Sequence, residues 1–309
     1  MLVRHGLSLA LFIRRTFSGI DTENIVFAAY YILIFIIAVP GNVLALWTFY
    51  HQKSMSPSKV FLTNLSIADI SYILILPMRI VYHLFDNNWP FAYVVCQLSG
   101  FLFYLNMYCS LYFMSLISLD RFLAVVLPLK SQPVRRVRYA RMVVGILWVT
   151  LIVLMSPVLF SEKNVAKNST TICNKLYLEK TSPTALVSTI VAFGIPLTTI
   201  VVSYILIMWK LQTVKQEVKD KVIKMIIVIL LNFLIAFVPY HVSRITYILH
   251  NNHRNMTVAS SGSLIKANKI TSALTCVNSV LDPVMYFFLN QAYRNKLLQL
   301  LGKNSRDVL

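Results

Sequence analysis

Acidic residues are scarce in this chain, and charged residues of either sign are few. The 309 residues include 11 Asp and Glu against 29 Lys and Arg, which gives a net charge of +18, and charged residues make up only 13% of the total. A soluble domain carries about 25%, because water must wet its surface. The basic residues are separated by long apolar runs, which is not the pattern of a nucleic-acid-binding module. We therefore expect an integral membrane protein with no nucleic acid polymer as a partner.

Apolar residues, by contrast, make up 57% of the chain, and the mean hydropathy is +0.68. A helix crosses the ~30 Å hydrocarbon core with about 20 mostly apolar residues. Segments of this kind occupy roughly residues 25–49, 57–85, 93–126, 139–160, 183–211, 222–249 and 263–289. None of them shows the ten-residue alternation of an outer-membrane barrel. The sequence predicts an all-α fold, a seven-transmembrane-helix bundle with a short amphipathic eighth helix.

The predicted spans divide the chain into three parts. We expect an N-terminal tail over residues 1–24, a membrane domain over 25–289, and an amphipathic helix with a short tail over 290–309. The last part reads as a short amphipathic helix that lies on the membrane surface.

The distribution of Lys and Arg between the loops predicts the orientation of the chain. Fifteen of them lie in the C-terminal tail and the loops on its side of the membrane, against nine in the N-terminal tail and the opposite loops. The C-terminus is therefore expected in the cytoplasm and the N-terminus outside. Two glycosylation sequons, at Asn168 and Asn255, fall in loops that this orientation places outside.

Only four cysteines are present, which excludes a disulfide scaffold and leaves room for one or two bridges. Cys96 begins the third span, and Cys173 lies in the large outer loop, so both are expected on the oxidising side. Cys109 and Cys276 lie inside spans, where cysteine usually acts as a small packing residue. We expect a disulfide between Cys96 and Cys173.

Two carboxylates lie deep in the membrane, where ionisable residues are costly and mark functional sites. Asp69 lies 12 residues into the second span, which is about 18 Å of helix, and Asp282 lies deep in the seventh. Carboxylate, hydroxyl and amide oxygens suit a hard cation such as Na⁺. The alternative is a hydrated hydrogen-bond network in which one of the two carboxyl groups is protonated. The candidate sodium ligands are Asp69, Asn106, Ser110, Asn278 and Asp282.

Short motifs mark each of the seven spans, and together they resemble those of rhodopsin-like (class A) G-protein-coupled receptors. In chain order they are Gly41-Asn42, Leu65-Ser-Ile-Ala-Asp69, Asp120-Arg121-Phe122, Trp148, Pro196 with Tyr204, Phe233-Leu-Ile-Ala-Phe237-Val-Pro239, and Asp282-Pro283-Val-Met-Tyr286. Three positions depart from the commonest pattern of that family: Phe122 stands in place of Tyr, Phe237 in place of Trp, and Asp282 in place of Asn.

In these departures the chain resembles one group within the family, the nucleotide and cysteinyl-leukotriene receptors. The similarity lies in the seventh-span motif together with Phe-x-Pro-Tyr-His-x-x-Arg over residues 237–244. Runs at 76–83, 100–108 and 270–275 look closest to the branch that recognises uracil nucleotides and cysteinyl leukotrienes. The group usually has a second outer bridge, from the N-terminal tail to the third outer loop, and this chain has no cysteine in either.

The resemblance implies a multi-pass receptor of the plasma membrane and not an enzyme. Its implied partners are an anionic small-molecule agonist outside, a heterotrimeric G protein inside, and membrane lipid around it. No cofactor is implied, apart from Na⁺ as an allosteric ion. Asp120 is expected to hold Arg121 at rest and to release it on activation. The residues implied in G-protein coupling and activation are Asp120, Arg121, Tyr204, Phe237, Pro239 and Tyr286.

The residues near the outer ends of the spans also indicate an anion site. Arg79 lies ten residues beyond Asp69, about 15 Å further out, and Arg244 lies five beyond Pro239. The outer acidic residues fall in loops. A cavity with basic walls and aromatic neighbours suits an anion with an aromatic or apolar body, although long basic side chains can instead snorkel to the interface. The candidate ligand-binding residues are Arg79, Tyr82, Phe103, Tyr104, Tyr108, His241, Arg244, Tyr247 and Lys269.

Other functions of seven-helix proteins fit the sequence less well. A retinal-binding protein needs a lysine deep in the seventh span, and Lys269, the innermost lysine of that span, is near its outer end. An intramembrane enzyme needs a nucleophile–base pair or metal ligands at depth, and His241 has no such partner at helical spacing. A constitutively active or decoy receptor, and a receptor for another small anion or a lysophospholipid, stay open as alternatives.

Overall fold

The computed structural model describes residues 21–160, 173, 182–212, 216–252 and 258–302. Regular structure within these ranges is helical. The elements are α2 (Thr22–His51), α3 (Pro57–Ile73), α4 (Leu76–Leu84), α5 (Tyr93–Val126), α6 (Val137–Met155), α7 (Pro157–Phe160), α8 (Pro183–Leu211), α9 (Gln216–Asn232), a π-helical turn (Phe233–Phe237), α10 (Val238–Asn252), α11 (Val258–Thr275), α12 (Asn278–Leu289) and α13 (Gln291–Leu300).

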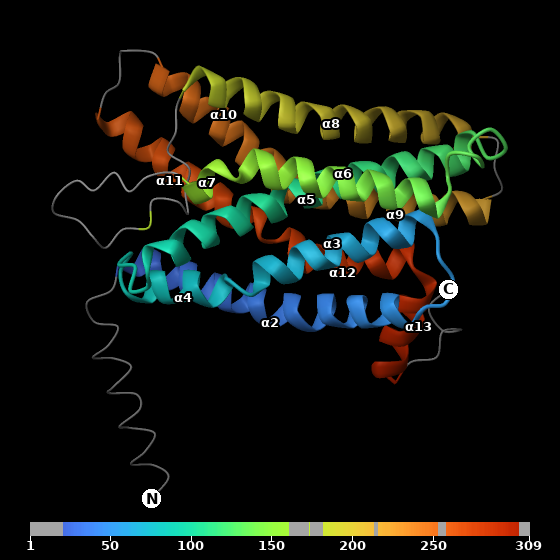
Figure 1. Cartoon of the computed structure of the whole chain (residues 1–309), viewed down its shortest axis with the longest axis horizontal. Helices are drawn as coiled ribbons and strands as arrows, with labels where there is room; N and C mark the ends of the chain where they lie inside the picture. The colour runs from blue at the N-terminus through green and yellow to red at the C-terminus, as the bar shows by residue number, and fades with distance from the viewer. Residues whose placement is uncertain (1–20, 161–172, 174–181, 213–215, 253–257, 303–309) are drawn as a thin grey trace, which may run out of the picture.

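These helices form seven membrane spans, as the sequence predicted, followed by the short helix α13. The spans are Thr22–His51, Pro57–Leu84, Tyr93–Val126, Val137–Phe160, Pro183–Leu211, Val222–Asn251 and Gly262–Leu289. The long helices run side by side along the molecule, and α13 lies across one end of the bundle (Figure 1). We call this end the α13 end, and the opposite end, which contains α4 and α7, the disulfide end.

Serine and proline start two of the spans. Oγ of Ser56 accepts a hydrogen bond from the backbone N–H of Lys59 at 3.2 Å, and α3 then begins at a proline. Ser182 caps α8 in the same way through the N–H of Ala185, also at 3.2 Å. A side-chain oxygen satisfies an N–H that the helix leaves unpaired, and proline is tolerated at the first helical position because it has no N–H to lose.

Proline also interrupts the helices inside the membrane, which the sequence-based boundaries did not anticipate. A proline in a helix cannot donate to the carbonyl four residues earlier. Pro283 thereby frees the Ser279 carbonyl, which instead accepts a hydrogen bond from Asn42 Nδ2 at 2.8 Å. Pro239 likewise cannot donate to the carbonyl of Ile235, four residues earlier. Ile235 lies in the π-helical turn that comes just before this proline. Each interruption is thus accommodated within the bundle.

Gly41 allows α2 and α12 to approach closely. A Cβ atom at this position would lie 2.6 Å from Cγ of Pro283. Tyr293 of α13 contacts both helices: its hydroxyl donates to the Gly41 carbonyl at 3.4 Å, and its ring meets the edge of Tyr286 with centroids 5.9 Å apart. Burial raises the pKa of Tyr293 to about 12, so it remains a neutral phenol. The α13 end is therefore held together by side chains from α2, α12 and α13.

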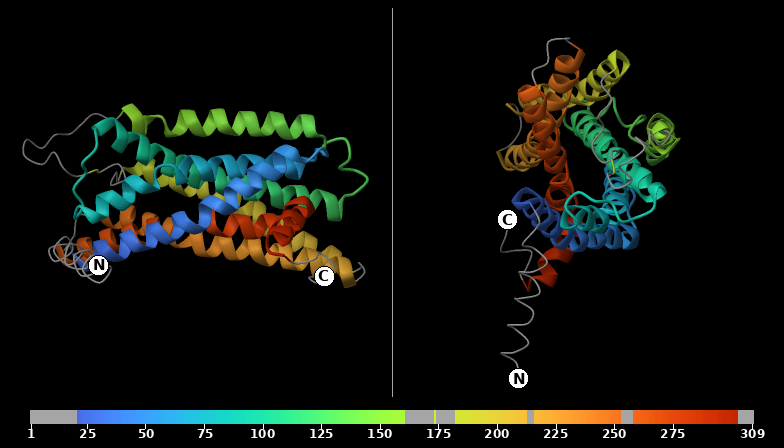
Figure 2. Two further views of the ribbon diagram at one scale, coloured as in Figure 1. Left: turned by 90° about the horizontal axis from the view of Figure 1, so that it is seen from below. Right: turned by 90° about the vertical axis from the view of Figure 1, so that its left-hand side faces the viewer.

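The fourth span lies at the periphery. Only 11% of its apolar stretch of 18 residues is buried. In the end-on view α6 (green) lies at the edge of the bundle (Figure 2). Large apolar side chains such as Ile146 and Val149 are exposed on it. An exposed apolar face on a helix of this length suits contact with lipid rather than with water.

Candidate ligand pocket and activation network

The predicted disulfide is present. Cys96 and Cys173 are bonded, with Cα atoms 5.7 Å apart, and both residues are buried. Trp89 and Tyr82 pack against the bridge, and their ring centroids lie 5.9 Å apart. Tyr82 was expected among the ligand-binding residues, but it lies on the disulfide because the chain after α4 folds back over it.

Arg79, from α4, lies inside a cage of aromatic rings. Its side chain is fully enclosed, with an exposed fraction of 1%. The guanidinium carbon lies 4.2 Å from the ring centroid of Phe103 and 5.8 Å from that of Tyr31, and Nη1 donates to the Tyr31 hydroxyl at 3.3 Å. A cation over an aromatic face is attracted by the ring quadrupole. The rings therefore hold the guanidinium in the interior, so Arg79 does not snorkel to the surface.

A polar network that the sequence did not predict lies beside Arg79. Nδ1 of His83 is 3.0 Å from Oδ1 of Asn24, and Nδ2 of Asn24 donates to Asp86 at 2.6 Å. The His83 ring stacks on Phe27 with centroids 5.0 Å apart. Asp86 was assigned to a loop, and it reaches the network because the backbone turns sharply there with a positive φ of 54°. Arg79 and Lys269 both lie close enough to act electrostatically on His83.

Arg244 and His241 form a second basic cluster, on α10. Arg244 is 4% exposed, and its guanidinium carbon lies 5.7 Å from the ring centroid of Tyr247. His241 stacks on Phe193 at 4.2 Å and meets the edge of Tyr108 at 6.0 Å. Its Nδ1 pairs with the Phe237 carbonyl at 2.8 Å, whereas Nε2 is buried with no hydrogen-bond partner among the described residues. A buried ring nitrogen in this situation is available to a ligand.

Phe103 and Tyr104 connect the two clusters. Their rings meet edge to face with centroids 4.8 Å apart, and Tyr104 is hydrogen-bonded to Tyr240, which in turn lies beside Arg244. The predicted ligand-binding residues are therefore brought to one end of the bundle, but as two clusters around separate guanidinium groups. Tyr82 packs on the disulfide and meets the His83 ring edge to face, with centroids 5.2 Å apart.

Asp69 lies at the centre of a buried polar network, as expected. Its Oδ1 accepts hydrogen bonds from Asn106 and Ser279, each at 3.0 Å, and its Oδ2 lies 3.4 Å from the Tyr286 hydroxyl. The carboxyl group of Asp282 interacts directly with that of Asp69. Ser279 was not among the candidate sodium ligands, and Tyr286 was expected only in activation. These contacts therefore join the second, third and seventh spans.

The remaining candidate sodium ligands are buried in the same region. Oγ of Ser110 and Oδ2 of Asp282 have no hydrogen-bond donor or acceptor within the described part of the chain. Oδ1 of Asp282 accepts from Asn232 at 2.7 Å, a contact the sequence analysis did not foresee. Oδ1 of Asn278 accepts a long hydrogen bond from Ser279 Oγ at 3.5 Å. Oxygen atoms of this kind are suitable ligands for a hard cation.

Asp120 at the α13 end has a different principal partner from the one expected. It accepts from Arg135 Nε at 2.8 Å and from Ser58 Oγ at 2.6 Å, while Arg121 lies further away at 3.6 Å. Arg121 instead donates to Ser58. Arg135 comes from the segment between α5 and α6, where the backbone N–H of Arg135 bonds to the Ser131 carbonyl at 2.9 Å. Arg135 therefore competes with Arg121 for the same carboxylate.

The other residues implied in activation come from α8, the π-helical turn, α10 and α12. The Ser118 hydroxyl and Tyr204, from α5 and α8, are joined by a 2.6 Å hydrogen bond. Phe237 closes the π-helical turn and Pro239 follows it, while Tyr286 reaches both Asn42 and Asp69 at 3.4 Å. The sequons at Asn168 and Asn255 lie outside the described residues.

Comparison with known proteins agrees with this architecture. Residues 41–286 match the family described as 7 transmembrane receptor (rhodopsin family). The chain is 48% identical to the uracil nucleotide/cysteinyl leukotriene receptor of Homo sapiens over 283 residues, covering 90% of this chain and 77% of that protein. The receptor of the same name from Mus musculus is 47% identical over 90% and 84% of the two chains, and a purinoceptor of Rattus norvegicus is 32% identical over 90% and 78%.

These matches cover most of the chain, and the expected similarity to nucleotide and cysteinyl-leukotriene receptors is confirmed. The family consists of non-enzymatic receptors that act through a ligand and a G protein. This chain belongs to the rhodopsin family of seven-transmembrane, G-protein-coupled receptors.

Proposed function

We propose that this receptor is activated by a small anion with an aromatic or apolar body, of the uracil nucleotide, nucleotide sugar or cysteinyl-leukotriene type. The observation that carries the proposal is the burial of Arg79 and Arg244 among aromatic side chains at the disulfide end. Guanidinium groups bind phosphate and carboxylate through paired, charge-assisted hydrogen bonds. The rings between them suit a nucleobase or a lipid chain. The names of the similar proteins fit the same chemistry.

Three groups contribute specifically to this pocket. Arg79 and Arg244 each supply a positive charge at one edge, and His241 supplies the buried Nε2 between Phe193 and Tyr108. An elongated anion that reaches both arginines would lie along Phe103 and Tyr104. A ligand with charge at only one end would engage one cluster alone, which gives a structural basis for distinguishing ligand classes.

A panel of anionic ligands applied to cells that express the full chain tests the proposal. Second-messenger output is measured with uracil nucleotides, nucleotide sugars, cysteinyl leukotrienes, lysophospholipids and small dicarboxylates, and with no addition. We expect a concentration-dependent response to one of the first three classes. High output with no addition that no member of the panel changes would instead support the ligand-independent alternative.

We further propose that the disulfide end faces the outside and the α13 end faces the cytoplasm and the G protein, with the receptor in the plasma membrane. The excess of Lys and Arg in the loops and tail of the α13 end supports this orientation. Arg121, Tyr204 and Tyr286 then lie on the side from which a G protein approaches. Antibody staining of an N-terminal epitope on intact, unpermeabilised cells tests the orientation.

We also propose that the network around Asp69 binds Na⁺. Its support is chemical, since the carboxylates of Asp69 and Asp282 and the unpaired hydroxyl oxygen of Ser110 are buried together in the interior. A bound cation would offset the repulsion between the two carboxylates. The competing arrangement is a proton shared between them, and the sodium dependence of agonist binding distinguishes the two.

A further inference from the structure

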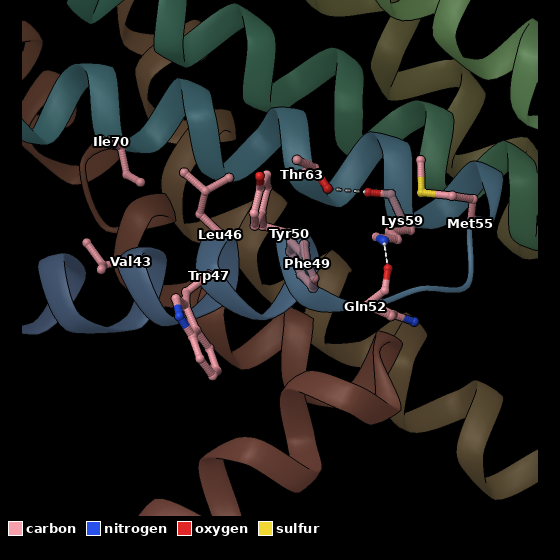
Figure 3. Close-up of a pocket in the computed structure, with 10 residues that line it drawn as sticks. All are labelled: Val43, Leu46, Trp47, Phe49, Tyr50, Gln52, Met55, Lys59, Thr63 and Ile70. Carbon is pink, nitrogen blue, oxygen red and sulfur yellow. Dashed lines mark hydrogen bonds between the residues drawn. The ribbon is translucent and has the colours of Figure 1, made fainter.

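A groove of about 680 Å³ lies between α2 and α3 at the α13 end, at the opposite end of the bundle from the candidate ligand pocket (Figure 3). Its wall is apolar along most of its length, with Val43 and Leu46 on α2 and Ile70 on α3. Trp47 stands at its outer side, and Lys59 lies at its end near Gln52. The groove opens outward, because Val43 and Trp47 are about half exposed.

The length of the groove matches one leaflet of a bilayer. Lys59 and Ile70 are eleven residues apart on the helix of α3, which is about 16 Å at 1.5 Å per residue. Half of the hydrocarbon core is about 15 Å. Because α3 begins at Pro57, Lys59 lies at the level of the lipid headgroups and Ile70 near the membrane centre. The groove thus extends over the depth of one acyl chain.

Only the headgroup end of the groove is charged, and it is positive. Lys59 is 5% exposed, and its ammonium group donates to the Gln52 carbonyl. An ammonium group has three N–H donors, so this bond leaves capacity for a second acceptor. No carboxylate lines the groove, and no ion pair of Lys59 occurs among the described residues. Lys296 of α13 adds a second cation beside Trp47, with Nζ 5.0 Å from the ring centroid.

We propose that this groove binds one anionic glycerophospholipid of the cytoplasmic leaflet, with its headgroup on Lys59 and an acyl chain along Leu46, Val43 and Ile70. The assignment to the cytoplasmic leaflet rests on the orientation proposed above. A sterol would fill the apolar part equally well, but its single hydroxyl gives no reason for a buried ammonium group at the headgroup level. The site adjoins the activation network, because Ser58, the residue before Lys59, donates to Asp120.

Photo-crosslinking of the purified full-length receptor in lipid nanodiscs tests the site. The probes are phosphatidylserine and phosphatidylcholine that carry the same photoactivatable acyl chain, and mass spectrometry maps the labelled peptides. A lysine near the membrane surface favours anionic lipid by about 1 kcal/mol, so we expect about fivefold more labelling of residues 43–70 by phosphatidylserine. No agonist is used and both leaflets contain the probe, so the result depends neither on the proposed ligand nor on the orientation.

Variants of the lysine identify its role. In Lys59→Gln the labelling by phosphatidylserine should fall to the level of phosphatidylcholine, because the amide still donates to Gln52 but carries no charge. Lys59→Arg should keep the preference. Lys53→Gln is the matched control, because Lys53 is exposed on the same side and does not line the groove; it should keep the preference too.

Four results would overturn the proposal. Equal labelling by the two lipids in the unchanged receptor would show ordinary annular lipid, and this comparison needs no variant to fold. A fivefold preference that survives Lys59→Gln, or one that Lys53→Gln also removes, would show a general surface effect. Displacement of both probes by cholesterol, to the same extent in the unchanged receptor and in Lys59→Gln, would assign the groove to a sterol.

Discussion

Arg244 carries the most direct prediction at the scale of single residues. If it binds the anionic part of the agonist, the lost charge-assisted contact costs about 1.5–3 kcal/mol. Arg244→Ala should therefore reduce agonist potency about tenfold or more, measured as second-messenger output at equal surface expression. The potency at Arg244→Lys should lie between those of the unchanged receptor and Arg244→Ala, because lysine keeps the charge but lacks the paired N–H donors of the guanidinium group.

A lysine at the same end of the bundle provides the control for Arg244. Lys266 is more than half exposed and forms an ion pair with Glu23 at 2.7 Å. Exposed ion pairs contribute about 0–1 kcal/mol, so Lys266→Ala should leave potency nearly unchanged. Equal losses in the two variants, or normal potency in Arg244→Ala, would show that Arg244 does not bind the ligand.

The sequence could identify the charged residues of the pocket but not their immediate neighbours. Arg79 and Arg244 stood out because charge is rare in apolar spans. Tyr82 was expected among the aromatic neighbours of the ligand, yet the disulfide and Trp89 pack against it. That contact joins parts of the chain far apart in sequence, and helical spacing carries no information about it.

At the scale of helices, the contact between α2 and α12 is tight enough to predict the effect of one carbon atom. In Gly41→Ala the new Cβ would lie 2.6 Å from Pro283, so the two helices must separate. Overpacking of this kind costs about 1–3 kcal/mol, and the thermal midpoint of the purified receptor should fall. Gly145→Ala is the matched control, because nothing lies within 4 Å of a Cβ there; it should leave the midpoint unchanged or raise it.

The segment between α5 and α6 carries a second prediction at this scale. Arg135 and Arg121 share the carboxylate of Asp120, and Arg135 is the nearer. Removing the nearer cation leaves Asp120 free to hold Arg121 more firmly, so Arg135→Gln should lower basal and agonist-stimulated G-protein activation. Nucleotide exchange on the G protein measures both.

Two further variants separate this mechanism from a general effect of charge. In Asp120→Asn the change Arg135→Gln should have little additional effect, because both act on the same contact. Arg136→Gln removes an exposed neighbouring charge and should leave activation unchanged. A rise in basal activity in Arg135→Gln would mean that Arg135 restrains the receptor, contrary to this prediction.

For the whole molecule, the seven spans could be predicted because a chain in lipid must satisfy its backbone within helices, which requires long apolar runs. The places where proline interrupts the helices could not be predicted in this way. They depend on a neighbour from another span, such as Asn42, that bonds the carbonyl which the proline leaves free. Asn232 escaped notice for a related reason. It directly precedes the π-helical turn, which changes the number of residues per turn, so helical spacing no longer shows which face Asn232 occupies.

The network around Asp69 connects α3, α5 and α12, and its ion dependence would be a property of the whole receptor. An ion held between the spans favours the arrangement in which they lie together, which is the inactive state if activation moves them apart. A ligand that favours the active state must then lose affinity as Na⁺ rises, because the coupling between two sites is reciprocal. We expect agonist affinity to be lower in Na⁺ than in N-methylglucamine at equal ionic strength.

Two variants test whether this sodium effect comes from the network. Asp69→Asn should abolish the difference in affinity, whereas Asp86→Asn, at the disulfide end, should retain it. A difference that persists in Asp69→Asn would place the ion elsewhere, and none in the unchanged receptor would favour a proton shared between Asp69 and Asp282.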